Sequence, residues 1–172
     1  MNSGAIESRQ FRRAMGKFAT GVTIVSYVNE ARPAAMTANA FMSLSMDPPM
    51  VLVAARNPSR FAGAVGAGQR IGISFLREEQ EMLSRHFGGQ PDLQLASPFR
   101  LDLAVPVIAN ALVQIVAKVH NVFPGGDHLI YTAEVERLEE ADGRPLLFFS
   151  GKYKQLHALD PLECWKDHAS LL

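Results

Sequence analysis

Residues 35–55 read AMTANAFMSLSMDPPMVLVAA, and this stretch decides more about the fold than any other part of the chain. It opens with small and polar residues, Thr37-Ala38-Asn39, which leave the backbone accessible to a ligand. Proline has no amide proton to give to a sheet, so Asp47-Pro48-Pro49 marks the entrance of a strand rather than its middle. The apolar run at 50–55 is typical of a strand that is buried on both faces.

Composition bounds the class of protein. The chain has 172 residues, of which 48% are hydrophobic and 20% charged, and this suits one domain with a packed core. We expect a single domain over 1–172, with an N-terminal extension at 1–7 and a C-terminal tail at 157–172. The 17 basic residues balance 17 acidic ones, so charge gives no reason to expect a nucleic acid or an anionic membrane as partner.

The sequence also predicts a location. It has no run of about 18 consecutive apolar residues, so no membrane span is expected. Its N-terminus lacks the apolar core of a signal peptide, and we therefore expect a cytoplasmic protein. The single cysteine, Cys164, cannot form an intrachain disulfide or a cysteine-based zinc site.

The first predicted helix runs from Ser8 to Thr20, with Ser8 as its N-cap and Gly21 as its stop. Its apolar residues recur three and four apart and form one stripe: Phe11, Ala14, Met15 and Phe18. The opposite face is basic, and we expect it to be solvated rather than to bind phosphate: Arg9, Arg12, Arg13 and Lys17.

Further elements follow from apolar patterns and turn residues. Strands are predicted over 22–28, up to 37, and over 50–55, 71–75, 111–123, 128–138 and 146–156. Helices are predicted over 60–65 and 78–87, and the proline-interrupted segment 90–106 is expected to be irregular. Turn-linked strands of this kind favour an antiparallel barrel, and the absence of a GxGxxG motif argues against a dinucleotide-binding parallel sheet.

One predicted hairpin joins 111–123 to 128–138. Odd-numbered positions are apolar in both strands, and they share one face only if the loop has an odd number of residues. Gly125-Gly126-Asp127 satisfies this condition and places His128 opposite Pro124. His120 then lies roughly 13 Å further along the strand, so one metal ion could not join the two histidines, and no metal site is expected.

Together with Gly125-Gly126-Asp127-His128, the 35–55 stretch resembles the flavin reductase-like family. These are small FMN-binding split barrels that serve as reductase components of two-component flavin monooxygenases. The resemblance covers roughly residues 11–156. It implies a mainly β (α+β) split β-barrel of six to seven antiparallel strands in Greek-key order, with two or three peripheral helices. It also implies a homodimer in which each site borrows residues from the other protomer, and a separate oxygenase component as partner.

The resemblance implies a flavin site as well. Small side chains in Thr37-Ala38-Asn39-Ala40 would let backbone amides approach the N5 and O4 edge of the flavin, although many relatives have Ser where this chain has Ala40. His128 would lie over the flavin as the catalytic residue and bind the nicotinamide. The segment 56–60 would contact the flavin phosphate. The remaining expected cofactor-binding residues are Ser43, Ser45, Arg56, Ser59, Arg60, Ser74 (where relatives have Asn), Phe75 and Tyr153.

The activity implied is NAD(P)H-dependent reduction of FMN or FAD, which would supply reduced flavin to a separate monooxygenase. The main alternative is a split barrel that binds FMN or a tetrapyrrole, or that reduces another substrate such as a corrinoid precursor. A third is an inert structural barrel. The sequence leaves open the choice between FMN and FAD and between NADH and NADPH.

Overall fold

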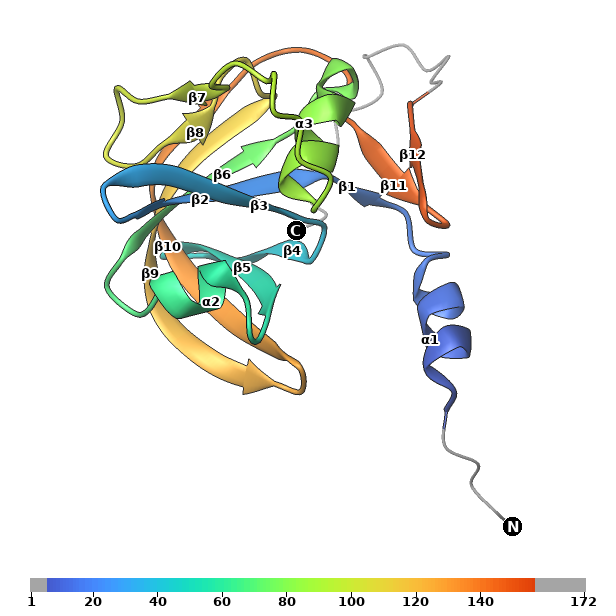
Figure 1. The fold of residues 1–172 in the computed structure, drawn as a ribbon. Helices are drawn as coiled ribbons and strands as arrows, with labels where there is room; N and C mark the ends of the chain where they lie inside the picture. The colour runs from blue at the N-terminus through green and yellow to red at the C-terminus, as the bar shows by residue number, and fades with distance from the viewer. Residues whose placement is uncertain (1–5, 157–172) are drawn as a thin grey trace, which may run out of the picture.

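The computed structural model describes residues 6–156, and within them the chain is mainly β, as predicted (Figure 1). Its helices are α1 (Ser8–Met15), α2 (Arg60–Ala64) and α3 (Glu81–Phe87), with a 3-10 turn, η1 (Glu78–Gln80), before α3. Its strands are β1 (Thr20–Gly21), β2 (Thr23–Asn29), β3 (Arg32–Ala38), β4 (Phe41–Met46), β5 (Pro49–Arg56), β6 (Arg70–Phe75), β7 (Phe99–Arg100), β8 (Val107–Ile108), β9 (Val113–Gly125), β10 (His128–Glu140), β11 (Leu147–Phe149) and β12 (Lys152–Lys154).

Seven strands form the main sheet, in the order β3-β2-β6-β9-β10-β5-β4, and every neighbouring pair is antiparallel. Two small sheets, β1-β11-β12 and β7-β8, accompany it. The main sheet curls around a core, with α2 and α3 at its periphery, while α1 stands away from the barrel (Figure 1). The prediction of six or seven antiparallel strands with peripheral helices is confirmed.

The core is built from aliphatic residues around an aromatic trio. The Phe61 ring, supplied by α2, meets the rings of Tyr27 and Tyr131 edge-on, with centroids 5.2 and 5.0 Å apart. All three side chains are buried. Because α2 reaches the core through Phe61, it closes one end of the barrel and fixes the loop that precedes it.

Strand β5 differs from its prediction. Val51, Val53 and Ala55 are buried, but the residues between them are only half-buried, so β5 faces the core on one side alone. A strand that the sequence did not predict, β4, pairs with β5 and ends the sheet. The outer face of this edge therefore remains partly exposed.

The β9–β10 hairpin also differs. His128 pairs with Gly125 rather than Pro124, so the loop has two residues, and Gly126 takes a φ of 70° that favours glycine. The predicted three-residue loop is therefore wrong. The parity argument failed because a bulge at His120 adds one residue to β9 and restores the common face of the apolar residues.

Helix α1 is shorter than predicted. It ends at Met15 with Gly16 as its C-cap, and Glu7 rather than Ser8 is its N-cap. The Ser150 amide donates to the Gly16 carbonyl (2.7 Å), and the chain then enters β1, which pairs with β11. This pairing explains why the helix stops before Thr20.

The predicted tail at 157–172, including Cys164, and residues 1–5 of the predicted extension lie outside the described residues. Among the helices within residues 6–156, none combines the length and the apolar character needed to cross a membrane.

Candidate functional site

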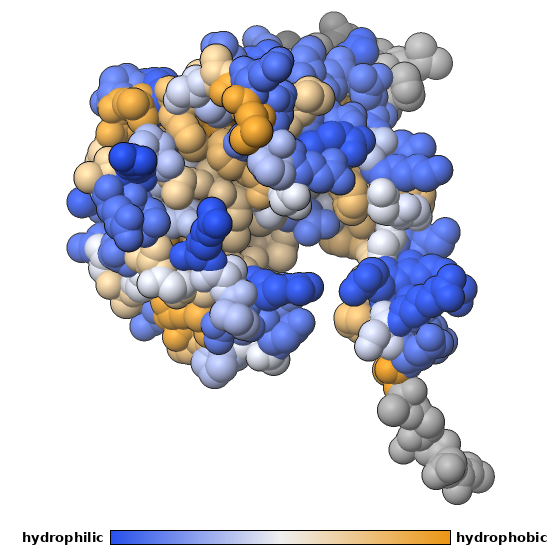
Figure 2. All heavy atoms as spheres, viewed as in Figure 1, coloured by the Kyte–Doolittle hydropathy of each residue, from blue (hydrophilic) through white to orange (hydrophobic). Residues whose placement is uncertain are grey.

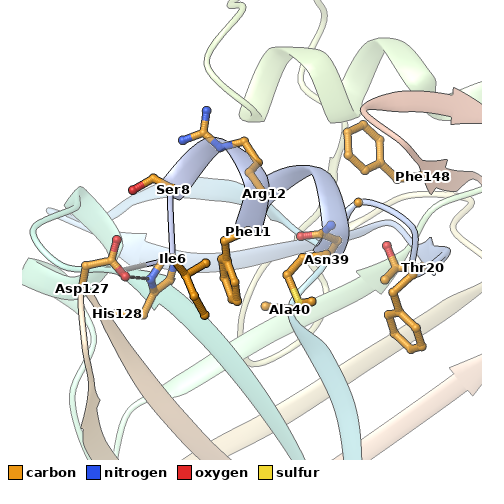
Figure 3. A pocket seen from close by; sticks show the side chains of 13 residues that line it. Ile6, Ser8, Phe11, Arg12, Thr20, Asn39, Ala40, Asp127, His128 and Phe148 are labelled. Carbon is orange, nitrogen blue, oxygen red and sulfur yellow. Dashed lines mark hydrogen bonds and ion pairs between the residues drawn. The ribbon is translucent and has the colours of Figure 1, made fainter. Parts of the chain in front are cut away.

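A hollow lies between α1 and the rim of the barrel, and we call it the main cleft (Figures 2 and 3). Its volume is about 960 Å³, within the range of sites that hold large organic ligands. Its lining brings together segments from both ends of the chain: Ile6, Ser8, Phe11, Arg12, Met15, Gly16, Phe18, Thr20, Asn39, Ala40, Asp127, His128 and Phe148.

One wall of the main cleft is the connection between β3 and β4, formed by Asn39 and Ala40 (Figure 3). The Ala40 carbonyl accepts a hydrogen bond from the Ala54 amide (3.0 Å), which anchors this connection to β5. Within residues 6–156, the amides of Asn39 and Ala40 have no acceptor. Both residues are exposed and line the cleft, so a ligand there could accept hydrogen bonds from their N–H groups.

The β9–β10 turn brings Asp127 and His128 to the same cleft. The Asp127 Oδ1 atom lies 2.7 Å from His128 Nδ1 (Figure 3). This hydrogen bond, with the nearby imidazole charge, lowers the pKa of Asp127 below its usual value. Asp127 thus orients the imidazole, and the other ring nitrogen of His128 is left for a ligand.

The predicted phosphate segment meets this turn. Arg56 pairs with His128 across β5 and β10, and the Asn57 amide donates to the Asp127 carbonyl at 2.9 Å. Arg56 also contributes to the lowered pKa of Asp127. The two motifs are about 70 residues apart in sequence, and the sheet register brings them together.

Downstream of Arg56, the Ser59 hydroxyl accepts from the Ala62 amide (3.1 Å) and caps α2, and the exposed Arg60 begins that helix. The cap occupies one lone pair of the Ser59 hydroxyl and leaves its proton free to donate. An anion beside this loop would meet that hydroxyl and the side chain of Arg60.

A smaller apolar cavity of about 320 Å³ lies beside the main cleft and shares Phe18, Thr20 and Asn39 with it. Phe75, a predicted site residue, lines this apolar cavity with Phe41, and their ring centroids are 4.9 Å apart. Phe75 therefore lies next to the main cleft but not on its surface.

Several other predicted residues are engaged inside the protein. The Thr37 hydroxyl donates to the Ser84 carbonyl (2.7 Å), and the Ser74 hydroxyl accepts from the Ile108 amide (2.9 Å) in a fully buried position. The Tyr153 hydroxyl shares a hydrogen bond of 2.8 Å with the Ser84 side chain. These contacts hold α3, β6 and β12 in place, and none of the three residues lines the main cleft.

Three further predicted residues, Ala38, Ser43 and Ser45, belong to β3 and β4 and do not line the main cleft. Ala38 is buried, and its carbonyl accepts from the Thr23 hydroxyl at 2.7 Å. Ser43 and Ser45 lie further along β4, on either side of a bulge. Their binding roles, like those of the other predicted site residues, stay predictions.

The sequence prediction missed the contribution of α1 and of Asp127. The apolar stripe of α1 was read as packing, yet Phe11 and Met15 line the main cleft and are 54% and 55% exposed. The stripe was the available signal, but amphipathicity does not say what a helix packs against. Asp127 stood within the recognised motif, and its position next to His128 was the signal for their hydrogen bond.

Comparisons with known proteins identify the family of the chain. A family model described as the flavin reductase like domain matches residues 15–157. An NADH-dependent flavin reductase of Rhodococcus sp. is 38% identical over 157 residues, which is 90% of this chain and 89% of the relative. The reductase component of 4-hydroxyphenylacetate 3-monooxygenase from Thermus thermophilus is 35% identical over 85% of this chain and 95% of its own length.

Solved structures show the same fold. The flavin reductase PheA2 superposes with a TM-score of 0.82 at 38% identity, covering 89% of this chain and all of that one. The Streptomyces globisporus NADH:FAD oxidoreductase SgcE6, in complex with NAD and FAD fragments, gives a TM-score of 0.78 at 28% identity, over 92% of this chain and 99% of the other. The predicted split barrel is therefore confirmed.

Proposed function

The chain belongs to the flavin reductase-like domain family, and from this premise we propose that it is an NADH-dependent flavin reductase acting on FMN or FAD in the main cleft. The observation that carries the proposal is that Asn39 and Ala40, whose amides have no acceptor within residues 6–156, line the same cleft as His128. We propose NADH rather than NADPH as the electron donor because relatives are named for NADH. The flavin is left as FMN or FAD because one relative is named an FMN reductase and another an FAD reductase.

The residues present fit a flavin. Its planar ring needs an apolar wall, donors along one polar edge and an anion site for the phosphate. Phe148 supplies apolar surface in the main cleft, and the Asn39 and Ala40 amides supply the donors. The 56–60 segment, next to Asp127, offers the hydroxyl and guanidinium groups for the phosphate.

The flavin and the nicotinamide supply the redox chemistry, in which a hydride passes from the nicotinamide to the flavin. The protein contributes position and charge. The Asn39 and Ala40 amides stabilise negative charge on the ring edge, because fixed N–H dipoles need no reorganisation. His128, held by Asp127, orients the nicotinamide. Such orientation matters because the reacting atoms must approach to about 3–3.5 Å.

The proposal includes a homodimer. Helix α1 stands away from the barrel with a hydrophobic side facing the hollow, and none of its residues is buried in the described chain (Figures 1 and 2). A helix of eight residues is marginal on its own, so its exposed stripe needs a partner surface. A second copy offers one in the edge strand β4, which exposes three apolar side chains: Met42, Leu44 and Met46.

The proposal further assigns the protein to the reductase side of a two-component system, because several relatives are named as reductase subunits of monooxygenases. A single domain over 1–172 is part of it, and the family model, which spans residues 15–157, supports that. The cytoplasmic location stays a prediction from the sequence.

The test is NADH oxidation by the purified protein with FMN, FAD, riboflavin or no flavin, repeated with NADPH. We expect turnover that depends on added flavin and is faster with NADH. A bound yellow chromophore without NADH oxidation would instead indicate a binding module. Absence of both turnover and flavin affinity would point to an inert barrel.

A further inference from the structure

A further cavity, of about 440 Å³, lies beside the basic face of α1, and we call it the basic cavity. Four of its seven lining residues are cationic, and none is acidic: Arg9, Arg12, Arg13, Gly16, Lys17, Ser150 and Gly151. Arg9, Arg12 and Arg13 lie three and four residues apart, so they project from one side of α1, and Lys17 follows just after its C-cap. This face was expected to be solvated surface, but in the structure it forms one wall of a cavity.

The charges of the basic cavity are uncompensated within residues 6–156. None of its four cations forms an ion pair there, although other arginines of the chain do so with Asp102, Glu136 and Glu139. Lys17 instead places its ammonium 5.9 Å from the centre of the Phe149 ring. The chain as a whole is neutral, so this concentration of positive charge is local. Clustered like charges repel one another unless an anion is present.

The opposite wall of the basic cavity is the β11–β12 turn. Ser150 and Gly151 both have positive φ, at 49° and 77°, and the Ser150 amide is bonded to Gly16. That bond fixes the end of α1 against the turn, so the two walls are held together. A cavity of this size, lined by guanidinium groups, suits a small multivalent anion better than a broad protein surface.

The basic cavity adjoins the main cleft. Arg12 and Gly16 line both of them, so α1 forms a shared partition. A ligand that has an aromatic ring in the main cleft and an anionic tail would bring that tail to the basic face of α1. Pyridine and flavin dinucleotides have this chemistry, because a pyrophosphate links their redox-active half to an adenylate.

We propose that the basic cavity binds the pyrophosphate of a dinucleotide whose redox-active ring lies in the main cleft. The inference rests on the proposed function. The pyrophosphate is that of NADH, because the 56–60 segment is already assigned to the phosphate of the flavin. It gives α1 two roles, with an apolar face toward the main cleft and a basic face toward the phosphates. Arg9 and Arg13 line the basic cavity and not the main cleft. Their guanidinium groups donate hydrogen bonds to the pyrophosphate.

The test compares Michaelis constants in the double variant Arg9→Gln/Arg13→Gln and in a matched control, Arg32→Gln/Arg144→Gln, which neutralises two exposed arginines elsewhere. FAD is compared with riboflavin at saturating NADH. NADH is compared with reduced nicotinamide riboside at saturating riboflavin. KM for NADH rises about tenfold in the double variant, whereas KM for FAD stays within about twofold of wild type. A rise in KM for FAD alone would overturn the inference.

The Michaelis constants for riboflavin and for reduced nicotinamide riboside stay within about twofold of wild type, and the control variant behaves as wild type. Inorganic pyrophosphate should also inhibit wild type in competition with the affected dinucleotide, and the double variant should lose this inhibition. Equal changes for substrates with and without pyrophosphate, or no change in any constant, would overturn the inference. If no constant changed, the basic face of α1 would instead be assigned to binding an acidic protein partner. Wild type that oxidises NADH with no flavin at all would contradict the proposed function instead.

Discussion

His128 is the residue on which the proposed chemistry depends most. Its Nδ1 atom is paired with Asp127, and its side chain remains 39% exposed at the main cleft. A residue in this position can contact an incoming nicotinamide without taking part in flavin binding. The hydrogen bond to Asp127 fixes the ring, so the exposed nitrogen presents a defined direction to the ligand.

We predict that His128→Ala raises KM for NADH about tenfold while flavin affinity changes less than threefold. The reason is that the Asn39 and Ala40 amides, which hold the flavin, are untouched by the substitution. Steady-state kinetics and a flavin fluorescence titration measure the two effects. His120→Ala, an exposed histidine on the same hairpin, is the control and should match wild type. A larger loss of flavin affinity than of NADH affinity would mean that the role of His128 is misassigned.

At this scale the sequence predicted some site residues and not others. Asn39, Ala40 and His128 line the main cleft, as predicted. They lie in or beside turns, whose short motifs can be recognised from the sequence alone. Ser74 does not, because its hydroxyl bonds the Ile108 amide of a segment 34 residues away. Tyr153 likewise bonds Ser84 of α3. Partners so distant in sequence leave no local pattern from which they could be predicted.

Strand β6 shows how a single element can depend on one glycine. The backbone of Pro106 crosses Gly72 so closely that a Cβ atom there would collide with the Pro106 carbonyl and lie 2.6 Å from Ser26 Oγ. The Ser26 hydroxyl also donates to that carbonyl. This close approach anchors the segment before β8 to the sheet.

We predict that Gly72→Ala lowers the free energy of unfolding by about 3 kcal/mol, since overpacking forces backbone atoms apart. Urea denaturation followed by circular dichroism measures it. Gly63→Ala in α2, where an added Cβ meets nothing within 4 Å, is the control and should be neutral or slightly stabilising. Equal stability of the two variants would show that the crossing is looser than described.

The short β7–β8 sheet is attached to the barrel by charge. Arg100 of β7 contacts Glu139 of β10 at 2.5 Å and Asp102 at 2.6 Å, and it donates to the Gln114 side chain at 2.8 Å. These hydrogen bonds lower the pKa of Glu139 and of Asp102 below their usual values. A carboxylate with a lowered pKa stabilises the folded state above its unfolded pKa, and this contribution is lost as pH falls through the folded pKa.

We therefore predict that the wild-type protein loses stability as pH falls below about 4.5, and that Arg100→Met shows a shallower decline. Thermal unfolding at a series of pH values measures this dependence. Arg144→Met removes an exposed arginine whose nearest carboxylate contact, with Glu78, is 4.0 Å long, and it should retain the wild-type pH profile. Parallel profiles for wild type and Arg100→Met would contradict the assignment.

At the scale of elements, the sequence predicted most strands and failed where tertiary contacts decide. The strand β4 was not predicted, although apolar residues alternate with serine in it. It lies between a turn that was assigned to ligand binding and two prolines. The hairpin loop was assigned one residue too many because the bulge at His120 has no signature of its own.

Within residues 6–156 the stripe of α1 and the edge strand β4 both expose apolar side chains. The α1 stripe includes Phe11, which is 54% exposed, and β4 includes Met42, at 51%. Neither surface could be matched with a partner from sequence, because apolar periodicity identifies a face that needs burial and not the surface that buries it. In the proposed homodimer, the α1 stripe of one copy would pack against β4 of the other, so both surfaces would be buried.

We predict that the wild-type protein has twice the chain mass by light scattering and that Phe11→Glu/Met15→Glu is monomeric, because charge on the α1 stripe opposes burial. The variant should also lose most of its flavin reductase activity, since the same residues line the main cleft. Leu93→Glu, at a loop residue that is 96% exposed, is the control and should remain dimeric. A monomeric wild type with full activity would contradict the proposed assembly.

The central claim is that the flavin ring lies against the main-chain amides between β3 and β4. The most direct measurement is a crystal structure of the protein soaked with FMN. The account predicts that the polar edge of the ring accepts hydrogen bonds from the Asn39 and Ala40 amides, with His128 on its open side. A ring bound elsewhere, or a main cleft filled by packed side chains, would contradict it.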